Sequence, residues 1–158
     1  MLGAGDKAPS FSLPEASGHL SSLSELLARG PTLLALYKIS CPVSQMTLPF
    51  LERIAQGRKP ADALQVVAIS QDDESATRHF CEKYKLTFPH LFDREEDGFK
   101  VSNAFGITNV PSLFLVETDG TISTASMGFV KRDLEAIGNR AGVEVFRAGE
   151  KVPEWKAG

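Results

Sequence analysis

Two cysteines, Cys41 and Cys81, supply the thiols of this chain. Cys41 follows the apolar run of residues 32–39 and precedes Pro42, a residue type that suits the first turn of a helix. At the start of a helix, unpaired backbone N–H groups and the positive end of the helix dipole favour an anionic group such as a thiolate. Because the thiolate is the nucleophilic form of cysteine, we predict that Cys41 reacts with disulfides or peroxides.

The competing interpretation of Cys41 is a buried and inert thiol, which is the usual state of a free cysteine. Its position after a strand argues against this, because ligands bind at the carboxyl ends of strands in open α/β sheets. Cys81 falls in the amphipathic segment 74–84, and we expect it to be a small core residue. A resolving role for Cys81 would require that helix to unwind.

The three histidines, His19, His79 and His90, are expected at the surface or in loops without partners. Together with the two cysteines they form no recognisable zinc-binding spacing. We therefore predict neither a metal site nor a cofactor.

The apolar pattern predicts alternating strands and helices around Cys41. Continuous apolar runs indicate buried strands, and apolar residues at helical spacing indicate amphipathic helices. Such alternation is typical of an α/β fold whose crossovers place helices on both faces of a sheet. The Thr-Asp-Gly sequence at 118–120 signals a hairpin, so we expect a mixed sheet with an antiparallel edge. The predicted strands are 32–39, 64–70, 88–92, 112–117 and 121–127, and the predicted helices begin near residues 22, 42, 74, 98 and 131.

The length of 158 residues fits one hydrophobic core, which we place in residues 1–142, followed by a C-terminal tail at 143–158. The formal net charge of −3 provides no basic excess for binding nucleic acid. No apolar run approaches the roughly 20 residues of a membrane-spanning helix. Because no secretory signal opens the chain, we expect a cytoplasmic protein, although a leader removed earlier would leave no trace.

Several stretches share their order and spacing with one known superfamily. The run 40–44, Ser-Cys-Pro-Val-Ser, followed by Pro-Phe-Leu at 49–51, is similar to an active-site helix of the thioredoxin superfamily. It most resembles the redoxin branch, which contains TlpA-like thiol-disulfide oxidoreductases and the AhpC/TSA peroxiredoxins. Further similar stretches are 5–13 (opening strand), 110–115 (cis-proline loop), 118–120 (hairpin) and 128–129 (closing segment). The resemblance implies a thioredoxin-like three-layer sandwich, with a central mixed sheet and helices on both faces.

The same resemblance implies roles for individual residues. Cys41 is the expected nucleophile, Ser44 holds the second position of the CxxC motif, and Pro111 is the expected cis-proline against Cys41. The backbone of Val110 is expected to pair with an extended substrate strand. The residues expected to contact the substrate are Pro42, Val43 and Val110. Outside this context, Pro111 is better interpreted as an ordinary turn proline before a strand.

Ser44 departs from the dithiol pattern, in which a second cysteine releases the mixed disulfide. With serine in that position, Cys41 forms the adduct and waits for an external thiol. Two interpretations of Ser44 remain open. It is a natural residue that donates its hydroxyl to the thiolate, as in monothiol glutaredoxins, or an engineered replacement of cysteine.

The peroxiredoxin pattern is also incomplete in this chain. That pattern has threonine or serine three residues before the reactive cysteine and proline seven before it, and these positions hold Lys38 and Leu34. Neither side chain provides a hydroxyl to orient a peroxide. Ala35 stands where many thioredoxins carry a buried acid.

These observations favour an oxidoreductase in which Cys41 attacks a protein or small-molecule disulfide. One alternative is a peroxiredoxin-type thiol peroxidase, in which a peroxide oxidises Cys41. The other is a non-catalytic thioredoxin-like module that holds an extended peptide in the groove beside Pro111.

Overall fold

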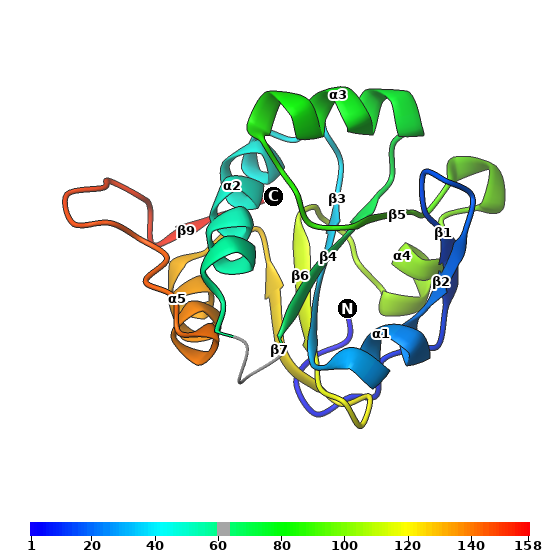
Figure 1. The fold of residues 1–158 in the computed structure, drawn as a ribbon, viewed down its shortest axis with the longest axis horizontal. Coiled ribbons are helices and arrows are strands. Elements are labelled where there is room, and N and C mark those ends of the chain that lie inside the picture. The colour runs from blue at the N-terminus through cyan, green and yellow to red at the C-terminus, as the bar shows by residue number, and fades with distance from the viewer. Residues whose placement is uncertain (60–63) are drawn as a thin grey trace.

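The computed structural model describes residues 1–59 and 64–158. Within them, a central sheet has the strand order β5-β4-β3-β6-β7 (Figure 1). Strands β3, β4 and β5 are parallel, whereas β6 is antiparallel to both β3 and β7. The predicted mixed sheet with an antiparallel edge is therefore present. The strands are β3 (Thr32–Tyr37), β4 (Gln65–Ser70), β5 (His90–Phe92), β6 (Ser112–Val116) and β7 (Ile122–Met127).

Helices cover both faces of this sheet. The helices α2 (Pro42–Gly57), α3 (Glu74–Tyr84) and α5 (Lys131–Ala141) pack into the core on one face, and α1 (Leu23–Arg29) and α4 (Lys100–Phe105) pack on the other. Along β3 the side chains alternate, so that Leu33 faces the first core and Leu34 the second. Both faces of β3 are buried, which is why its sequence is continuously apolar. No helix in the described part of the chain combines the length and apolarity needed to cross a bilayer.

Some predicted boundaries were too wide. Strand β3 ends at Tyr37 because the next residue, Lys38, is exposed. Strand β5 begins only at His90, after Pro89, which lacks the N–H needed for a ladder bond. The helix expected to begin near residue 98 begins at Lys100, after a short 3₁₀ turn, η1 (Glu95–Asp97).

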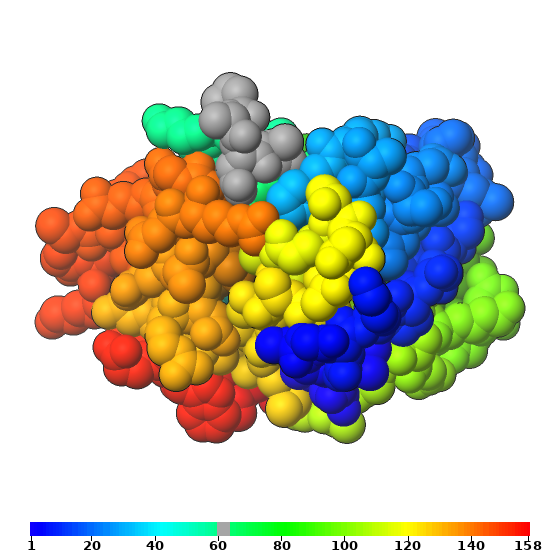
Figure 2. All heavy atoms as spheres, turned by 90° about the horizontal axis from the view of Figure 1, so that it is seen from below, coloured from blue at the N-terminus to red at the C-terminus, as the bar shows by residue number. Residues whose placement is uncertain are grey.

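The N-terminal residues form a border along the sheet. A small hairpin joins β1 (Ser12–Pro14) to β2 (Leu20–Ser22), and Ser22 then caps α1 by accepting a hydrogen bond from the N–H of Glu25. Ahead of the hairpin, the N–H of Gly5 donates to the carbonyl of Ile122 at 2.8 Å. Figure 2 shows these first residues, in blue, lying against the yellow β6–β7 region.

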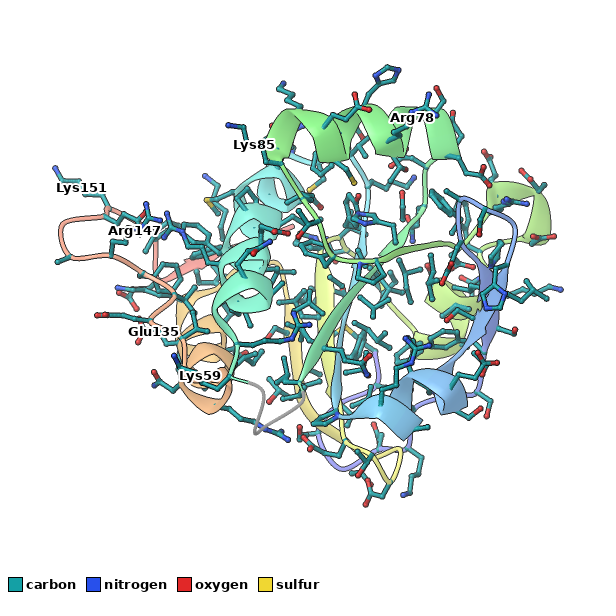
Figure 3. The ribbon with its side chains drawn as sticks, viewed as in Figure 1. Lys59, Arg78, Lys85, Glu135, Arg147 and Lys151 are labelled. Atoms are coloured by element: carbon teal, nitrogen blue, oxygen red, sulfur yellow. The ribbon has the colours of Figure 1, made fainter. Side chains whose placement is uncertain are left out.

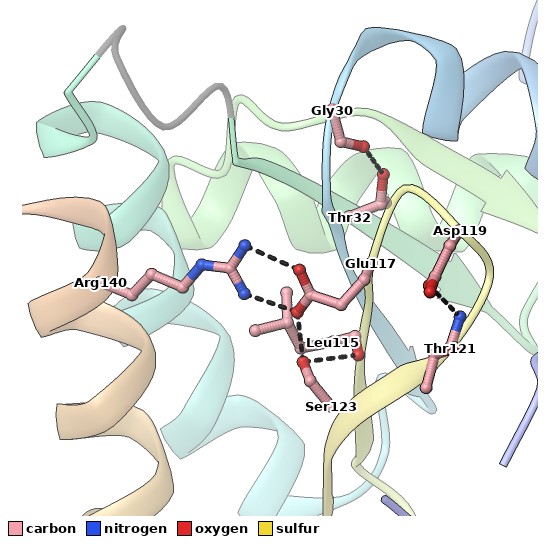
Figure 4. A network of polar contacts seen from close by, with 8 residues as sticks. All are labelled: Gly30, Thr32, Leu115, Glu117, Asp119, Thr121, Ser123 and Arg140. Atoms are coloured by element: carbon pink, nitrogen blue, oxygen red, sulfur yellow. Dashed lines mark hydrogen bonds and ion pairs between the residues drawn. The ribbon is translucent and has the colours of Figure 1, made fainter. Parts of the chain in front are cut away.

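A bidentate ion pair connects α5 to the residue that follows β6. Arg140 donates from Nη1 and Nη2 to the carboxylate of Glu117 at 2.5 and 2.8 Å (Figure 4). The hydroxyl of Ser123, on β7, donates to the same carboxylate. These hydrogen bonds lower the pKa of Glu117, so the carboxylate stays ionised near neutral pH.

Residues 143–158 run back across the domain. The side chain of Val145 is buried in the core beneath α5, and the loop that follows carries Arg147 and Lys151 outward (Figure 3). Glu150 binds Arg53 of α2 through two hydrogen bonds of 2.7 and 2.6 Å, which lower the pKa of Glu150 to about 2. The chain then enters β9 (Trp155–Lys156), which pairs antiparallel with β8 (Phe129–Val130).

Candidate active site

Cys41 lies at the junction between β3 and α2, as the sequence predicted. It is the N-cap residue of α2, and its carbonyl accepts the first helical hydrogen bond from the N–H of Gln45 at 3.0 Å. Its own N–H donates to the carbonyl of Lys38 at 3.2 Å. The side chain is half-buried and packs at the margin of the larger core. The thiol is thus fixed at a helix start without being enclosed in hydrocarbon.

Two side chains that the sequence analysis missed fix the backbone just before Cys41. The N–H of Ile39 donates to Oδ2 of Asp72 at 2.8 Å, and the carbonyl of Ile39 accepts from Nε2 of Gln45 at 2.9 Å. Asp72 follows β4, the parallel neighbour of β3, so both strands end at the same edge of the sheet. A polar residue just after that neighbouring strand was the available signal for this contact. These two hydrogen bonds fix the backbone of Ile39, two residues before Cys41, at both its N–H and its carbonyl group.

The loop before β6 brings Val110 and Pro111 to the cysteine. The Val110–Pro111 peptide bond is cis, and Sγ of Cys41 donates a hydrogen bond to the carbonyl oxygen of Val110 at 3.2 Å. Pro111 is buried, whereas Val110 is half-buried. The structure therefore brings together three residues expected at the site from the sequence.

The other expected site residues are placed differently. Pro42 is exposed beside Cys41, but Val43 is buried in the core, because residues 42 and 43 lie on different faces of the first turn of α2. Val43 is therefore not available to contact a substrate. Ser44 is fully buried, and its hydroxyl has no hydrogen-bond partner within the described residues. The structure does not bring that hydroxyl to the sulfur of Cys41, contrary to one of the two interpretations of Ser44.

The positions that a peroxiredoxin or a thioredoxin would use are occupied by two residues of β3 and by Lys38 just after it, which have other roles. The ammonium group of Lys38 lies over the ring of Phe99, 5.7 Å from its centroid, and so turns toward α4. Leu34 and Ala35 are fully buried on opposite faces of β3. None of these three side chains provides a hydroxyl or a carboxylate to Cys41.

The second thiol belongs to a separate, partly buried cluster. Sγ of Cys81, on α3, lies 3.4 Å from Nε2 of His90, which also contacts the hydroxyl of Tyr37 at 2.7 Å. The prediction that His90 lies at the surface without partners was wrong. Because β5 pairs in parallel with β4, it carries His90 under α3 and beside the end of β3.

Burial determines the protonation of this cluster. It raises the pKa of Cys81 to about 11, lowers that of His90 to about 4, and raises that of Tyr37 above its ordinary value. Near neutral pH the group is therefore an uncharged thiol, imidazole and phenol. Cys81 packs against the core while remaining partly exposed, and its protonated thiol is a poor nucleophile.

The acidic, histidine and cysteine side chains of residues 1–59 and 64–158 form no group of three that could hold a metal ion.

The sequence and the fold both match known proteins. The model of the AhpC/TSA family matches residues 4–125. The chain belongs to the AhpC/TSA family. It is 29% identical over 137 residues to the thioredoxin-like protein YneN of Bacillus subtilis, with 83% of this chain and 76% of that protein covered. It is 27% identical over 126 residues to the thiol-disulfide oxidoreductase ResA of Halalkalibacterium halodurans, with 79% and 69% covered.

Solved structures show the same architecture. A putative thiol:disulfide interchange protein DsbE from Chlorobium tepidum superposes with a TM-score of 0.75 at 26% identity, covering 89% of this chain and 96% of that one. The peroxidoxin BcpB of Mycobacterium tuberculosis superposes with a TM-score of 0.71 at 22% identity, over 89% and 94% of the two chains, a likeness of fold alone. These matches confirm the predicted thioredoxin-like, redoxin-type fold. The chain is an oxidoreductase, and its relative ResA is named a thiol-disulfide oxidoreductase.

Proposed function

We propose that the thiol of Cys41 is the nucleophile of a thiol–disulfide exchange reaction. The observation that carries this proposal is the contact between Sγ of Cys41 and the carbonyl of Val110, beside the cis peptide bond to Pro111. It places a half-buried thiol at a helix start and next to a backbone group that can pair with an extended strand. The relatives named ResA are thiol-disulfide oxidoreductases, which agrees with this chemistry.

The first step is attack by the Cys41 thiolate on one sulfur of a substrate disulfide. In the resting thiol, the S–H donates to the carbonyl of Val110. Loss of that proton to solvent leaves the thiolate at the N-terminus of α2 and removes the hydrogen bond, so that the carbonyl is free to accept one from a substrate N–H. The new S–S bond joins Cys41 to one half of the substrate, and the other half leaves as a thiolate and takes up a proton from solvent.

The second step requires an external thiol. Position 44 holds serine, whose buried hydroxyl cannot displace a sulfur. Cys81 is held in the cluster with Tyr37 and His90 and is protonated near neutral pH. A thiolate from outside the chain therefore attacks the mixed disulfide, forms a disulfide with the bound half of the substrate, and returns Cys41 to its thiolate. In the net reaction the substrate disulfide exchanges one thiol partner and Cys41 is unchanged.

The substrate class that fits this site is a disulfide within an extended peptide or protein segment. Backbone pairing at Val110 would align the attacked sulfur with Sγ of Cys41 without reading side chains. Pro42, the residue after Cys41, is exposed.

Mixed-disulfide trapping tests the proposal. A short peptide whose single cysteine forms a disulfide with a small thiol is incubated with the protein, and intact mass and peptide mapping locate the adduct. We expect an adduct on Cys41 in the wild type and in Cys81→Ala, and none in Cys41→Ala. An adduct on Cys81 alone, or no adduct, would overturn the proposal. Rapid oxidation of Cys41 by hydrogen peroxide without any exchange with the peptide would instead support a thiol peroxidase.

A further inference from the structure

The last residues of the chain return to the site of Cys41. The N–H of Lys131 donates to the carbonyl of Glu154 at 3.0 Å, and β9 then pairs with β8. Beyond β9, the side-chain amide of Asn109 donates to the carbonyl of Gly158 at 3.2 Å. We refer to residues 154–158 as the return segment. It contains the two-residue strand β9 and runs from the start of α5 to the loop carrying the cis peptide bond.

The return segment touches the same carbonyl as the reactive thiol. A Cβ atom built on Gly158 would lie 2.1 Å from the carbonyl oxygen of Val110 and 2.8 Å from its carbonyl carbon. Sγ of Cys41 donates to that oxygen at 3.2 Å. Gly158 and the thiol therefore contact one peptide group, at the place where the proposed function requires a substrate strand.

Close backbone packing continues along the segment. A Cβ atom built on Gly128 would lie 2.2 Å from the carbonyl oxygen of Lys156, and Gly128, with a φ of +80°, is buried. Backbone thus meets backbone at Gly128 and at Val110, and only glycines permit the approach. A second strand has no room on this surface while the return segment is in place.

The segment is held by its backbone rather than by buried side chains. All five of its residues are exposed, and Trp155 is 62% exposed. It contains no cysteine, so Cys41 cannot form a disulfide with it. An occupant of this kind covers the site, cannot react, and leaves without opening the core.

We propose that the return segment occupies the substrate-strand position beside Cys41 and competes with incoming disulfide peptides. The inference rests on the proposed function, and it adds a regulatory element to that site. The segment behaves as an internal pseudosubstrate whose release precedes substrate binding. Occupancy by the segment reduces the apparent affinity for substrate in proportion to the fraction of open molecules.

Steady-state kinetics with the disulfide peptide and an external thiol test this inference. We expect deletion of residues 154–158 to lower KM roughly fivefold to tenfold with kcat unchanged, because the competitor is lost and the reacting groups stay. The matched control is Trp155→Ala, which keeps the backbone pairing and should leave both constants at their wild-type values.

A second variant in the full-length chain covers the case in which the shortened chain unfolds. Gly158→Val places a side chain against the carbonyl of Val110 and should lower KM in the same direction. Its control is Gly3→Val, which adds the same side chain at a position with nothing within 4 Å.

The outcomes separate this inference from the proposed function. An unchanged or higher KM in the deletion and in Gly158→Val, with exchange through Cys41 intact, would overturn the inference and leave the proposed function standing. Absence of any adduct on Cys41 in every variant would overturn the proposed function.

Discussion

The sulfur of Cys41 lies 3.2 Å from the carbonyl oxygen of Val110, 69 residues further along the chain. The sheet brings the two together, because β3 and β6 are antiparallel neighbours in which Leu36 pairs with Ser112. The end of β3 therefore meets the start of β6, and the residues just beyond this pair are the ones that meet at the site. The contact between thiol and carbonyl therefore depends on the register of these two strands.

Asp72 should control the rate of exchange through its bond to Ile39. We expect Asp72→Ala to slow mixed-disulfide formation by about tenfold, because the peptide before Cys41 loses one of its two restraints. The measurement is the rate of adduct formation by stopped reaction and mass spectrometry. Asp72→Asn keeps an acceptor oxygen and should recover most of the rate. Equal rates in Asp72→Ala and the wild type would contradict the positioning role.

Cys81 should resist alkylation in the native protein. Burial raises the pKa of Cys81 to about 11 from the ordinary value of 9.0, so the fraction of thiolate at pH 8 falls by about a hundredfold. Iodoacetamide labelling at pH 8, followed by peptide mapping, should show that Cys41 is alkylated and that Cys81 is largely unmodified. In concentrated urea both should react. Native labelling of Cys81 at the rate seen in urea would show that the cluster does not shield the thiol.

His90 should make stability depend on pH between about 4 and 6.5. Its folded-state pKa of about 4 is below the ordinary value of 6.5, so the unfolded chain binds more protons in this window. The contribution of the neutral histidine is therefore complete above pH 6.5 and is lost as the pH falls toward 4. We expect urea unfolding to show a loss of about 2 kcal/mol between pH 7.5 and pH 5.

The matched variant for this pH effect is His90→Gln, in which the titrating group is absent. Its unfolding free energy should be lower at pH 7.5 but nearly constant down to pH 5. Carboxylates with lowered pKa values, such as Glu117, stabilise the fold while they are ionised, and most of that stabilisation is lost only below about pH 4.5. They therefore add little to the change between pH 7.5 and pH 5. A wild-type stability that stays flat from pH 7.5 to 5 would show that His90 does not titrate as its burial requires.

Ser44→Cys should convert the single-thiol site into a dithiol site. A thiol one helical turn from Cys41 attacks the mixed disulfide within the molecule, so release should be at least about a hundredfold faster than with an external thiol at micromolar concentration. The lifetime of the peptide adduct after rapid removal of free thiols measures this. Ser44→Ala is the control, and it should keep the long-lived adduct while gaining about 1 kcal/mol in stability, because it removes a buried hydroxyl that has no partner in the described part of the chain. An equally long-lived adduct in Ser44→Cys would mean that position 44 cannot reach the sulfur.

The sequence predicted those features that depend on local pattern. The apolar run of β3, the cap of α1 at Ser22 and the start of α2 at Pro42 each follow from neighbouring residue types, and all three are present. The meeting of Cys41 with Pro111 was expected only through family resemblance, because no local pattern joins residues so far apart. The burial of Val43 and Ser44 was not predicted. One apolar and one polar residue in the first turn of a helix do not indicate which face of that helix the rest of the fold covers.

Other features had no signature that a single sequence could show. His90 acquires its partners from β3 and α3, whose approach depends on how the sheet is ordered. The return segment pairs through backbone groups, and backbone pairing places few demands on side-chain type. Its close glycine contacts depend on the carbonyls of Val110 and Lys156, which the fold, and no local pattern, brings against Gly158 and Gly128.

The ion pair between Arg53 and Glu150 ties the chain to α2. Glu150 lies four residues before Glu154, where the return segment begins. Because the anchor, the covering strand and the thiol all belong to one molecule, the covered fraction does not change on dilution. Activity per molecule should be the same at nanomolar and micromolar protein, whereas a cover supplied by another copy would be lost. A short tether also keeps the return segment at a local concentration of about the millimolar range beside Cys41. Disulfide substrates that are scarce or that bind weakly therefore do not displace it.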